Sequence, residues 1–352
     1  MSPTHREPRE TAVRAVVYRR TGACEVLQLE DRTASHPGPG EVLVRIHRSG
    51  VNPTDWKARQ GSGASQPVEP AQVPGHDGAG VVEAIGAGVS PALQGARVWV
   101  WEAAYRRPDG TAQELALVPA SHVLRLPDPA SFDLGASLGV PFITAHRCLT
   151  VAEHAPSRLG PGRLAGRTVL VAGGAGAVGN AAIQLARWSD ATVITTVSSP
   201  QKGELAVAAG ADHVINYWEQ EVVAEVLKMA ADGVDMIVEV SPAANAAIDA
   251  AVIGRHGCVA VYANNGGEDL TLPVRDLMVV NARWQFVLLY TAPALAKTTA
   301  VEDFGTAVAS GAIRVGQDAG LPLHHYPLEQ TGDAHSAVEG GAIGKVLIDV
   351  VP

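Results

Sequence analysis

The residues with the clearest capacity for chemistry lie in a glycine-rich loop that follows an apolar run at residues 168–172. Three glycines in this loop spell a G-x-G-x-x-G pattern, which permits a tight turn, close backbone approach to a pyrophosphate and close packing of a helix on a strand. The first amides of the helix would then face the anion. An ordinary glycine-rich turn is the alternative. The predicted phosphate-binding residues are Gly174, Ala175, Gly176, Ala177, Val178 and Gly179.

The segments on either side of the loop have the order strand, helix, strand. Apolar residues at helical spacing continue to about Trp188, and a second apolar run covers residues 191–197. This order favours a nucleotide-binding loop over a chance cluster of glycines. It predicts a dinucleotide site at the carboxyl ends of parallel strands.

The end of the second predicted strand indicates which dinucleotide is bound. NAD-binding proteins usually place an acidic residue there, about 20 residues beyond the loop, to bind the ribose hydroxyls. Here Ser198 and Ser199 end the strand, Ser199 and Pro200 predict a helix start, Lys202 follows, and Tyr217 ends the next strand. Ser198, Lys202 and Tyr217 would surround a 2′-phosphate, which predicts NADPH as the cofactor. The alternative for Lys202 is a solvated surface lysine.

Composition limits the class of protein. The length of 352 residues favours two domains, and the 47% hydrophobic and 18% charged fractions fit a soluble enzyme. A formal net charge of -9 gives no general attraction for nucleic acid or an anionic membrane, and no apolar stretch is long enough to span a bilayer. Three scattered cysteines and an N-terminus without an apolar signal core lead us to expect a cytoplasmic protein.

Two kinds of region follow one another along the chain. From Val13 to about Leu126, short apolar runs separated by Gly and Pro predict a partly open β-barrel, and residues 60–73 predict a surface loop. A Gly/Pro-rich connection at residues 155–166 leads into the glycine-loop region, where apolar runs and helical patterns alternate. Segments after about Leu295 have helix-then-strand character and would return to the first domain.

With these pieces in order, the whole chain resembles the medium-chain dehydrogenase/reductase superfamily, and within it the zinc-independent quinone oxidoreductases related to zeta-crystallin. The matching segments are residues 49–55, 74–82, 139–145, the glycine loop, 210–217 and 344–347. The resemblance implies an α/β fold with two domains. A Rossmann-type, doubly wound parallel sheet would form residues 146–290, and a GroES-like, partly open β-barrel catalytic domain would form residues 1–145 and 291–352. It also implies a homodimer.

The resemblance raises the question of a catalytic metal. The Cys, His and Cys ligands of the zinc-dependent branch correspond here to Asn52, His76 and Val140. A catalytic zinc needs three protein donors, and neither valine nor an asparagine amide is a competent one. The sequence therefore predicts no metal, and His76 becomes a structural or pocket-wall histidine.

Without a metal, hydride transfer needs an acceptor that is already electron-poor. Quinones and α,β-unsaturated carbonyls fit, because resonance stabilises the anion that hydride delivery produces, and the protein contributes mainly by positioning. By resemblance, Asn52 and Thr144 lie beside the nicotinamide as the candidate catalytic residues. The alternatives are a turn residue before Pro53 for Asn52 and a hydroxyl bonded within its helix for Thr144.

Further candidate cofactor contacts lie after the later strands, at the sheet edge where ligands bind. The apolar residues 286–288 are candidates both for a nicotinamide wall and for an edge strand that pairs across a dimer. The full set is Ser241, Ala263, Asn264, Asn265, Phe286, Val287, Leu288 and, in the closing family segment, Lys345.

The candidate substrate pocket consists of Trp56, Trp101 and Tyr105 with His76, because flat acceptors stack on aromatic faces. Structural packing is the alternative for each ring. Three functions stay open: NADPH-dependent reduction of small quinones or enones, reduction of one double bond in a large polyketide-like intermediate, and NADPH binding with little turnover.

Overall fold

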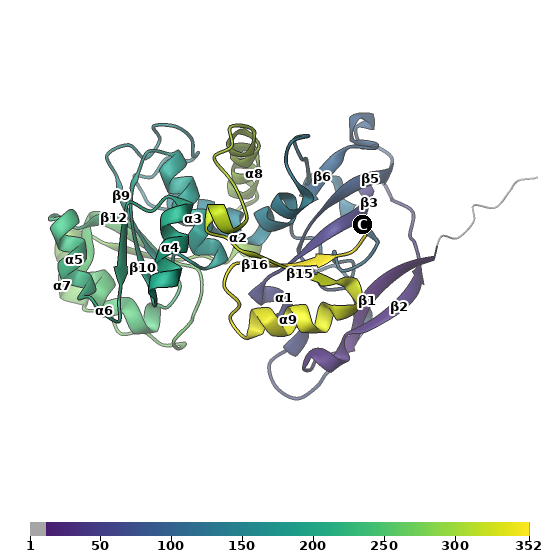
Figure 1. Cartoon of the computed structure of the whole chain (residues 1–352), viewed down its shortest axis with the longest axis horizontal. Coiled ribbons are helices and arrows are strands. Elements are labelled where there is room, and N and C mark those ends of the chain that lie inside the picture. The colour runs from purple at the N-terminus through teal and green to yellow at the C-terminus, as the bar shows by residue number, and fades with distance from the viewer. Residues whose placement is uncertain (1–11, 352) are drawn as a thin grey trace, which may run out of the picture. The chain divides into compact units, whose positions relative to one another are not determined.

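Figure 1 shows the computed structural model, which describes residues 12–351. Contacts divide the chain into two compact units. Among the described residues, unit 1 comprises 12–136, His325–Ala342 and 346–351, and unit 2 comprises Ser137–His324 and Ile343–Lys345. The N-terminal segment without a signal core lies outside the described residues. Within residues 12–351, no helix combines the length and the apolar character needed to cross a membrane.

Unit 2 is built on a six-stranded parallel sheet with helices on both faces. Its strands are β9 (Thr168–Ala172), β10 (Thr192–Val197), β11 (His213–Asn216), β12 (Val234–Glu239), β13 (Ile253–Val261) and β14 (Arg283–Phe286). Its sheet helices are α3 (Ala177–Trp188), α4 (Pro200–Ala209), α5 (Val222–Met229), α6 (Pro242–Val252) and α7 (Val274–Val280). The strand order β11-β10-β9-β12-β13-β14, all parallel, confirms the predicted doubly wound sheet. In Figure 1, α3 and α4 lie on one face and α5 and α6 on the other.

The strands of this sheet are continuous apolar runs because helices cover both of their faces. In β9, Val169 and Val171 are fully buried, and Val169 lies between Val193 of β10 and Met236 of β12. Burying such runs supplies most of the favourable free energy of this unit. The apolar runs at residues 168–172 and 191–197 are therefore central strands of the sheet, as predicted.

Unit 1 consists mainly of antiparallel strands. They are β1 (Ala12–Arg20), β2 (Gln28–Thr33), β3 (Glu41–Val51), β4 (Pro67–Gln72), β5 (Asp77–Ile85), β6 (Arg97–Val100), β7 (Leu115–Pro119), β8 (Val123–Arg125) and most of β15 (Leu323–Pro327) and of β16 (Lys345–Asp349), whose first residues belong to unit 2. The large sheet has the order β15-β16-β3-β5-β6-β8, with β7 also pairing with β3, and a second sheet has the order β2-β1-β4. Valine and isoleucine side chains such as Val44, Ile46 and Val98 fill the core.

Both ends of the chain contribute to unit 1. Helix α1 (Pro53–Gln60) and helix α9 (Thr331–Glu339) lie side by side in Figure 1, and an ion pair of 3.2 Å joins Arg59 of α1 to Glu339 of α9. The prediction of a plain surface loop at residues 60–73 was wrong, because β4 occupies part of it and pairs Gln72 with Tyr18 of β1.

The boundaries of the two units differ from the predicted boundaries at 146 and 291. Residues 137–145 belong to α2 (Phe132–Thr150), and the division falls inside this helix. Residues 291–324, which include α8 (Ala294–Ala309), belong to unit 2. Contacts between residues that are far apart in the sequence place these segments in unit 2. Local patterns in the sequence do not reveal such contacts.

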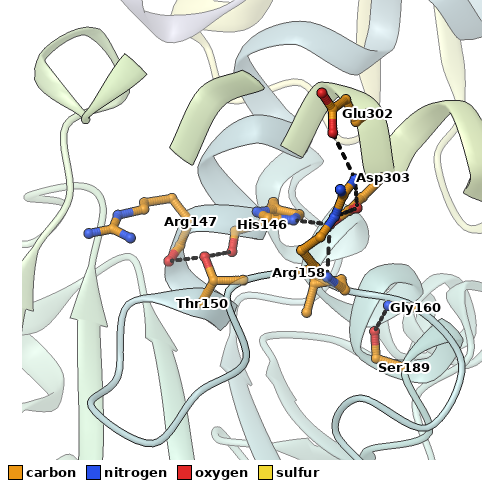
Figure 2. A network of polar contacts seen from close by, with 9 residues as sticks. His146, Arg147, Thr150, Arg158, Gly160, Ser189, Glu302 and Asp303 are labelled. Atoms are coloured by element: carbon orange, nitrogen blue, oxygen red, sulfur yellow. Dashed lines mark hydrogen bonds and ion pairs between the residues drawn. The ribbon is translucent and has the colours of Figure 1, made fainter. Parts of the chain in front are cut away.

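Asp303 on α8 anchors the chain connection that precedes β9. Its carboxylate accepts hydrogen bonds from His146 Nε2 (2.9 Å), Arg158 Nε (2.8 Å) and the Leu159 amide (2.8 Å), as Figure 2 shows around Asp303. Burial alone would raise the pKa of Asp303, but these donors outweigh it and hold the pKa below its ordinary value. The neighbouring Glu302 also pairs with Arg158, at 3.0 Å, but its side chain is about half exposed.

We expect Asp303→Asn to destabilise the protein by about 2–3 kcal/mol, because His146 and Arg158 lose their charged acceptor inside the protein. Glu302→Gln is the matched control and should change the free energy of unfolding by less than about 0.5 kcal/mol, because its ion pair is solvated. Urea unfolding of both variants measures the difference. Equal effects of the two substitutions would contradict the anchoring role of Asp303.

Candidate active site

The glycine loop joins β9 to α3 at the carboxyl edge of the parallel sheet. Gly173 has a φ of +69°, in the left-handed region that glycine favours. A Cβ at Gly174 would lie 2.2 Å from Thr195 Oγ1, and a Cβ at Gly179 would lie 2.3 Å from the carbonyl oxygen of Gly173. The tight turn is therefore made by Gly173, which precedes the predicted pattern, whereas Gly174 and Gly179 permit close packing on the loop and the neighbouring strand.

Gly176 marks the open side of the loop. It is the N-cap residue of α3, it is exposed, and a Cβ there would meet nothing closer than the Gly173 carbonyl oxygen at 3.4 Å. No side chain caps the start of α3. The positive end of the helix dipole therefore faces an open approach, an arrangement that suits a phosphate group.

Ser198 and Lys202 lie together at the end of β10. Lys202 Nζ donates a hydrogen bond to Ser198 Oγ (2.8 Å), and the Lys202 amide donates to Ser199 Oγ (3.3 Å), which confirms the predicted N-cap. The Tyr217 amide donates to the last carbonyl of β10 at 3.1 Å. The fold thus brings Ser198, Lys202 and Tyr217 to the ends of two adjacent strands.

A cavity of about 380 Å³ opens at this edge of the sheet. Gly173, Thr196, Tyr217 and Ser241 contribute to its lining from the ends of four strands, and α5 and α6 complete it. Ser198 and Lys202 are not part of this lining. Cavities of this size at the carboxyl edge of doubly wound sheets hold small-molecule ligands.

Two carboxyl groups that sequence reasoning missed lie in the wall of this cavity. Glu239 is fully buried and accepts hydrogen bonds from the Ser241 amide and from Asn245 Nδ2 (3.0 Å). Burial, and then the nearby Glu239 carboxylate, raise the pKa of Asp249 to about 9. Asp249 is therefore protonated at neutral pH, which removes one negative charge from a cavity beside a candidate phosphate site.

The loop after β13 is tied to the end of β12. The Asn265 amide donates to the Val240 carbonyl at 3.1 Å, which holds this loop beside Ser241, the N-cap residue of α6. Asn264 and Asn265 are exposed, whereas Ala263 is half-buried. These residues share the sheet edge that carries the glycine loop, as predicted.

The remaining predicted cofactor contacts differ in exposure. Phe286 and Leu288 are 61% and 57% exposed, whereas Val287 between them is buried. They extend from β14, which is the edge strand of the sheet. Lys345 is buried in unit 2, with its amide donating to the Pro322 carbonyl at 2.8 Å.

The two candidate catalytic residues are both buried and lie in different units. Thr144 lies within α2 in unit 2. Asn52 is the N-cap residue of α1 in unit 1, and its amide Nδ2 donates to Asp77 Oδ2 at 2.8 Å. The Asn52 backbone amide donates to Asp55 Oδ2 (2.7 Å), which completes a capping box. These contacts fix Asn52 at the start of α1, and the Asn-Pro-x-Asp spacing is the sequence signal for the capping box.

His76 is buried next to the same carboxylates. Its Nε2 atom is 3.9 Å from Asp55 Oδ1. Burial lowers the pKa of His76 to about 4, although the Asp77 carboxylate opposes this shift. His76 is therefore neutral at physiological pH.

The predicted aromatic residues have different surroundings within unit 1. Trp101 is buried and stacks on His122, with ring centroids 4.5 Å apart. Trp56 and Tyr105 are half-buried, with Lys57 and Arg106 over their respective rings. Packing thus accounts for Trp101, whereas Trp56 and Tyr105 keep partly accessible faces.

The residues at the three zinc-ligand positions are divided between the two units. Asn52 and His76 belong to unit 1 and Val140 belongs to unit 2. Among residues 12–351, no group of three or more His, Cys, Asp and Glu side chains is arranged to hold a metal ion.

We expect Gly179→Ala to destabilise the protein by about 1–3 kcal/mol, because the added methyl group collides with a backbone carbonyl. Gly305→Ala on α8 is the matched control, since a Cβ there meets nothing within 4 Å. That change should be neutral or stabilise the helix by up to about 1 kcal/mol. Thermal unfolding measures both, and a neutral Gly179→Ala variant would contradict the close packing of α3 on the loop.

The lowered pKa of His76 predicts a pH dependence of stability. The unfolded chain binds a proton at His76 below about pH 6.5, whereas the folded chain binds this proton only below about pH 4. The free energy of unfolding therefore falls as the pH falls through this window. Between pH 7 and pH 4, wild type should lose about 3 kcal/mol more than His76→Gln, whose side chain does not titrate. Urea unfolding at each pH measures this difference, and parallel profiles would refute it.

The comparisons with known proteins agree with this architecture. The zinc-binding dehydrogenase family matches residues 177–308, and the alcohol dehydrogenase GroES-like domain matches residues 38–128. The quinone oxidoreductase of Homo sapiens is 30% identical over 344 residues, covering 96% of this chain and 97% of that protein.

Two solved structures are similar over nearly their whole length. A mycobacterial protein solved in complex with NADPH is 28% identical, with a TM-score of 0.78, covering 96% of this chain and 99% of that chain. An NAD-dependent alcohol dehydrogenase is 26% identical, with a TM-score of 0.83, covering 96% and 100%. The predicted α/β fold with a GroES-like domain is confirmed. The chain belongs to the quinone oxidoreductase family of the medium-chain dehydrogenase/reductase superfamily and is an oxidoreductase.

Proposed function

We propose that the protein is an NADPH-dependent reductase that acts on quinones and related α,β-unsaturated carbonyls without a metal. The observation that carries this proposal is the pair formed by Lys202 and Ser198 at the end of β10, beside the glycine loop. The human relative is named a quinone oxidoreductase, and the mycobacterial relative was solved with NADPH.

The residues at the carboxyl edge fit NADPH. The amides of residues 174–179 would bind the pyrophosphate, because the open side at Gly176 admits an anion. Lys202, Ser198 and Tyr217 would bind the 2′-phosphate through charge-assisted hydrogen bonds. The protonated Asp249 adds no repulsion to this anionic ligand.

Ser241 and residues 263–265 would contact the ribose and nicotinamide, since their loops are tied together at this edge. Residues 286–288 and Lys345 are the further candidates for the nicotinamide end.

The exposed Phe286 and Leu288 also support a homodimer that forms through the β14 edge. The free thiols of Cys24, Cys148 and Cys258 suit a cytoplasmic protein.

Bound NADPH supplies a hydride for an electron-poor acceptor. The protein's own contribution is then to bind, to orient and to exclude water. In this proposal Asn52, whose amide is fixed by Asp77, and Thr144 orient the reactants, and Trp56 and Tyr105 offer faces to a flat acceptor, with His76 and Trp101 supporting them. No step is assigned to a zinc ion, because Asn52 and Val140 are not zinc donors.

The direct test mixes the purified protein with NADPH and a series of small quinones and enones while the absorbance of the reduced nicotinamide is followed. Turnover with quinones, together with far less than one zinc per chain by elemental analysis, is the expected result. Tight NADPH binding without turnover of any small acceptor would contradict the proposal, as would stoichiometric zinc.

We expect Lys202→Ala to weaken NADPH binding about 10–100-fold, because the ammonium that neutralises the 2′-phosphate is lost. NADH binding should change by less than about twofold. Lys228→Ala, in the last turn of α5 and paired with Glu225, is the control and should leave both affinities unchanged. Calorimetric titration of both dinucleotides gives the answer, and an equal loss for NADPH and NADH would refute the role of Lys202.

A further inference from the structure

A second cavity in unit 2 lies at the opposite edge of the parallel sheet, at the amino ends of β9 and β12. Its volume is about 350 Å³. The basic residues of its lining are His154, Arg163, Arg167, Arg255 and His256. This concentration of basic side chains stands out in a chain whose formal net charge is -9. The function proposed above does not use it.

The lining contains a single carboxylate, Asp235, and both of its oxygens already accept hydrogen bonds. Asp235 Oδ1 accepts from Arg167 Nη1 at 2.6 Å, and its Oδ2 accepts from the Thr168 amide at 2.8 Å. The lining therefore offers no second carboxylate to Arg163 or Arg255. Two guanidinium charges in one cavity give it a positive potential that favours an anion.

The wall that carries Arg163 is held in place by hydrogen bonds. This wall is the Gly/Pro-rich connection at residues 155–166, in which Arg158 bonds to Asp303 and the Gly160 amide donates to Ser189 Oγ at 3.2 Å (Figure 2). The Gly162 amide, next to Arg163, donates to Asp190 Oδ2 at 2.7 Å. A fixed wall reduces the entropy that a ligand must overcome on binding.

The part of the lining that β13 contributes contains a strained residue. His256 has a φ of +61°, a conformation that costs a non-glycine residue about 1 kcal/mol or more, and its ring lies edge-on to that of His154 with centroids 6.1 Å apart. The apolar residues of the lining are the partly accessible Ala152, Ala155, Pro156 and Ala165 and the buried Leu164 and Met236. The cavity therefore combines cationic groups with an apolar surface.

We propose that this cavity binds an organic phosphate, whose phosphoryl group is recognised by Arg163 and Arg255 and whose carbon skeleton contacts the apolar lining. Guanidinium groups match the geometry of phosphate oxygens and bind them with charge-assisted hydrogen bonds. The site is separate from the proposed NADPH site, because strands of five to six residues place the two edges of a sheet roughly 17–20 Å apart.

Phenyl phosphate, which joins a phosphoryl group to an apolar ring, is the probe. Calorimetry on the full chain at constant ionic strength should show saturable binding of one molecule per chain, tighter than inorganic phosphate by about fivefold or more. Arg163→Gln and Arg255→Gln should each weaken it about tenfold. Arg19→Gln, in an exposed ion pair with Glu30 of unit 1, is the matched control and should have no effect.

The cofactor site provides the second control. Lys202→Ala should leave the affinity for phenyl phosphate unchanged, and Arg163→Gln and Arg255→Gln should leave the affinity for NADPH unchanged. Loss of phenyl phosphate binding in Lys202→Ala would overturn the proposal, because the probe would then occupy the cofactor site. Equal binding of phenyl phosphate, phosphate and sulfate would overturn it as well, because the cavity would then hold an adventitious ion only.

The outcome is independent of the proposed reductase function. If NADPH binds and phenyl phosphate does not, the second site is refuted and the reductase proposal stands. If phenyl phosphate binds through the arginines and NADPH does not bind, the second site stands and the reductase proposal is refuted. Thermal unfolding of each variant checks that the substituted chains are folded, since both arginines are exposed and their removal should not lower stability.

Discussion

The close approach of α3 to the end of β9 is the constraint on which the nucleotide site depends. The carbonyl oxygen of Gly173 occupies space that a Cβ at Gly179 would need, so the helix begins directly against the strand. This contact aims the uncapped amino end of α3 along the carboxyl edge of the sheet and leaves Gly176 facing open space. Lys202, in the first turn of α4, and Tyr217, just after β11, lie at the same edge. This edge therefore offers a phosphate-rich ligand both the positive end of a helix dipole and a cationic side chain.

Charge is distributed unequally over the nucleotide-binding unit. The chain is acidic, yet the carboxyl edge offers an ammonium group and a protonated Asp249, and the amino edge offers two arginines that lack a carboxylate partner in their cavity. In unit 1, by contrast, the buried Asp55 and Asp77 are engaged by backbone amides and by Asn52, next to a neutral His76. Local environment therefore determines the charge of each site, which the overall composition does not reveal.

Local signals in the sequence predicted much of the fold and the cofactor site. The apolar runs of β9 and β10, the glycine pattern and the Ser199 cap are each encoded within a few residues, and the structure has them. Features that depend on distant contacts were missed: Gly173 as the turn residue, the burial of Asp249 close to the Glu239 carboxylate, and the anchoring of Arg158 and Leu159 by Asp303. The strand β4 was mistaken for a loop because its Pro-containing segment is an edge strand in which no residue is fully buried.

In the proposed function, the amides of the glycine loop bind the pyrophosphate of the dinucleotide. Hydrogen exchange of the full chain, followed by mass spectrometry with and without saturating NADPH, measures this contact. Peptides covering residues 173–180 should become strongly protected when NADPH is added, together with those covering residues 198–202. Unchanged exchange in residues 173–180 at saturating NADPH would contradict it, because the ligand would then be bound elsewhere.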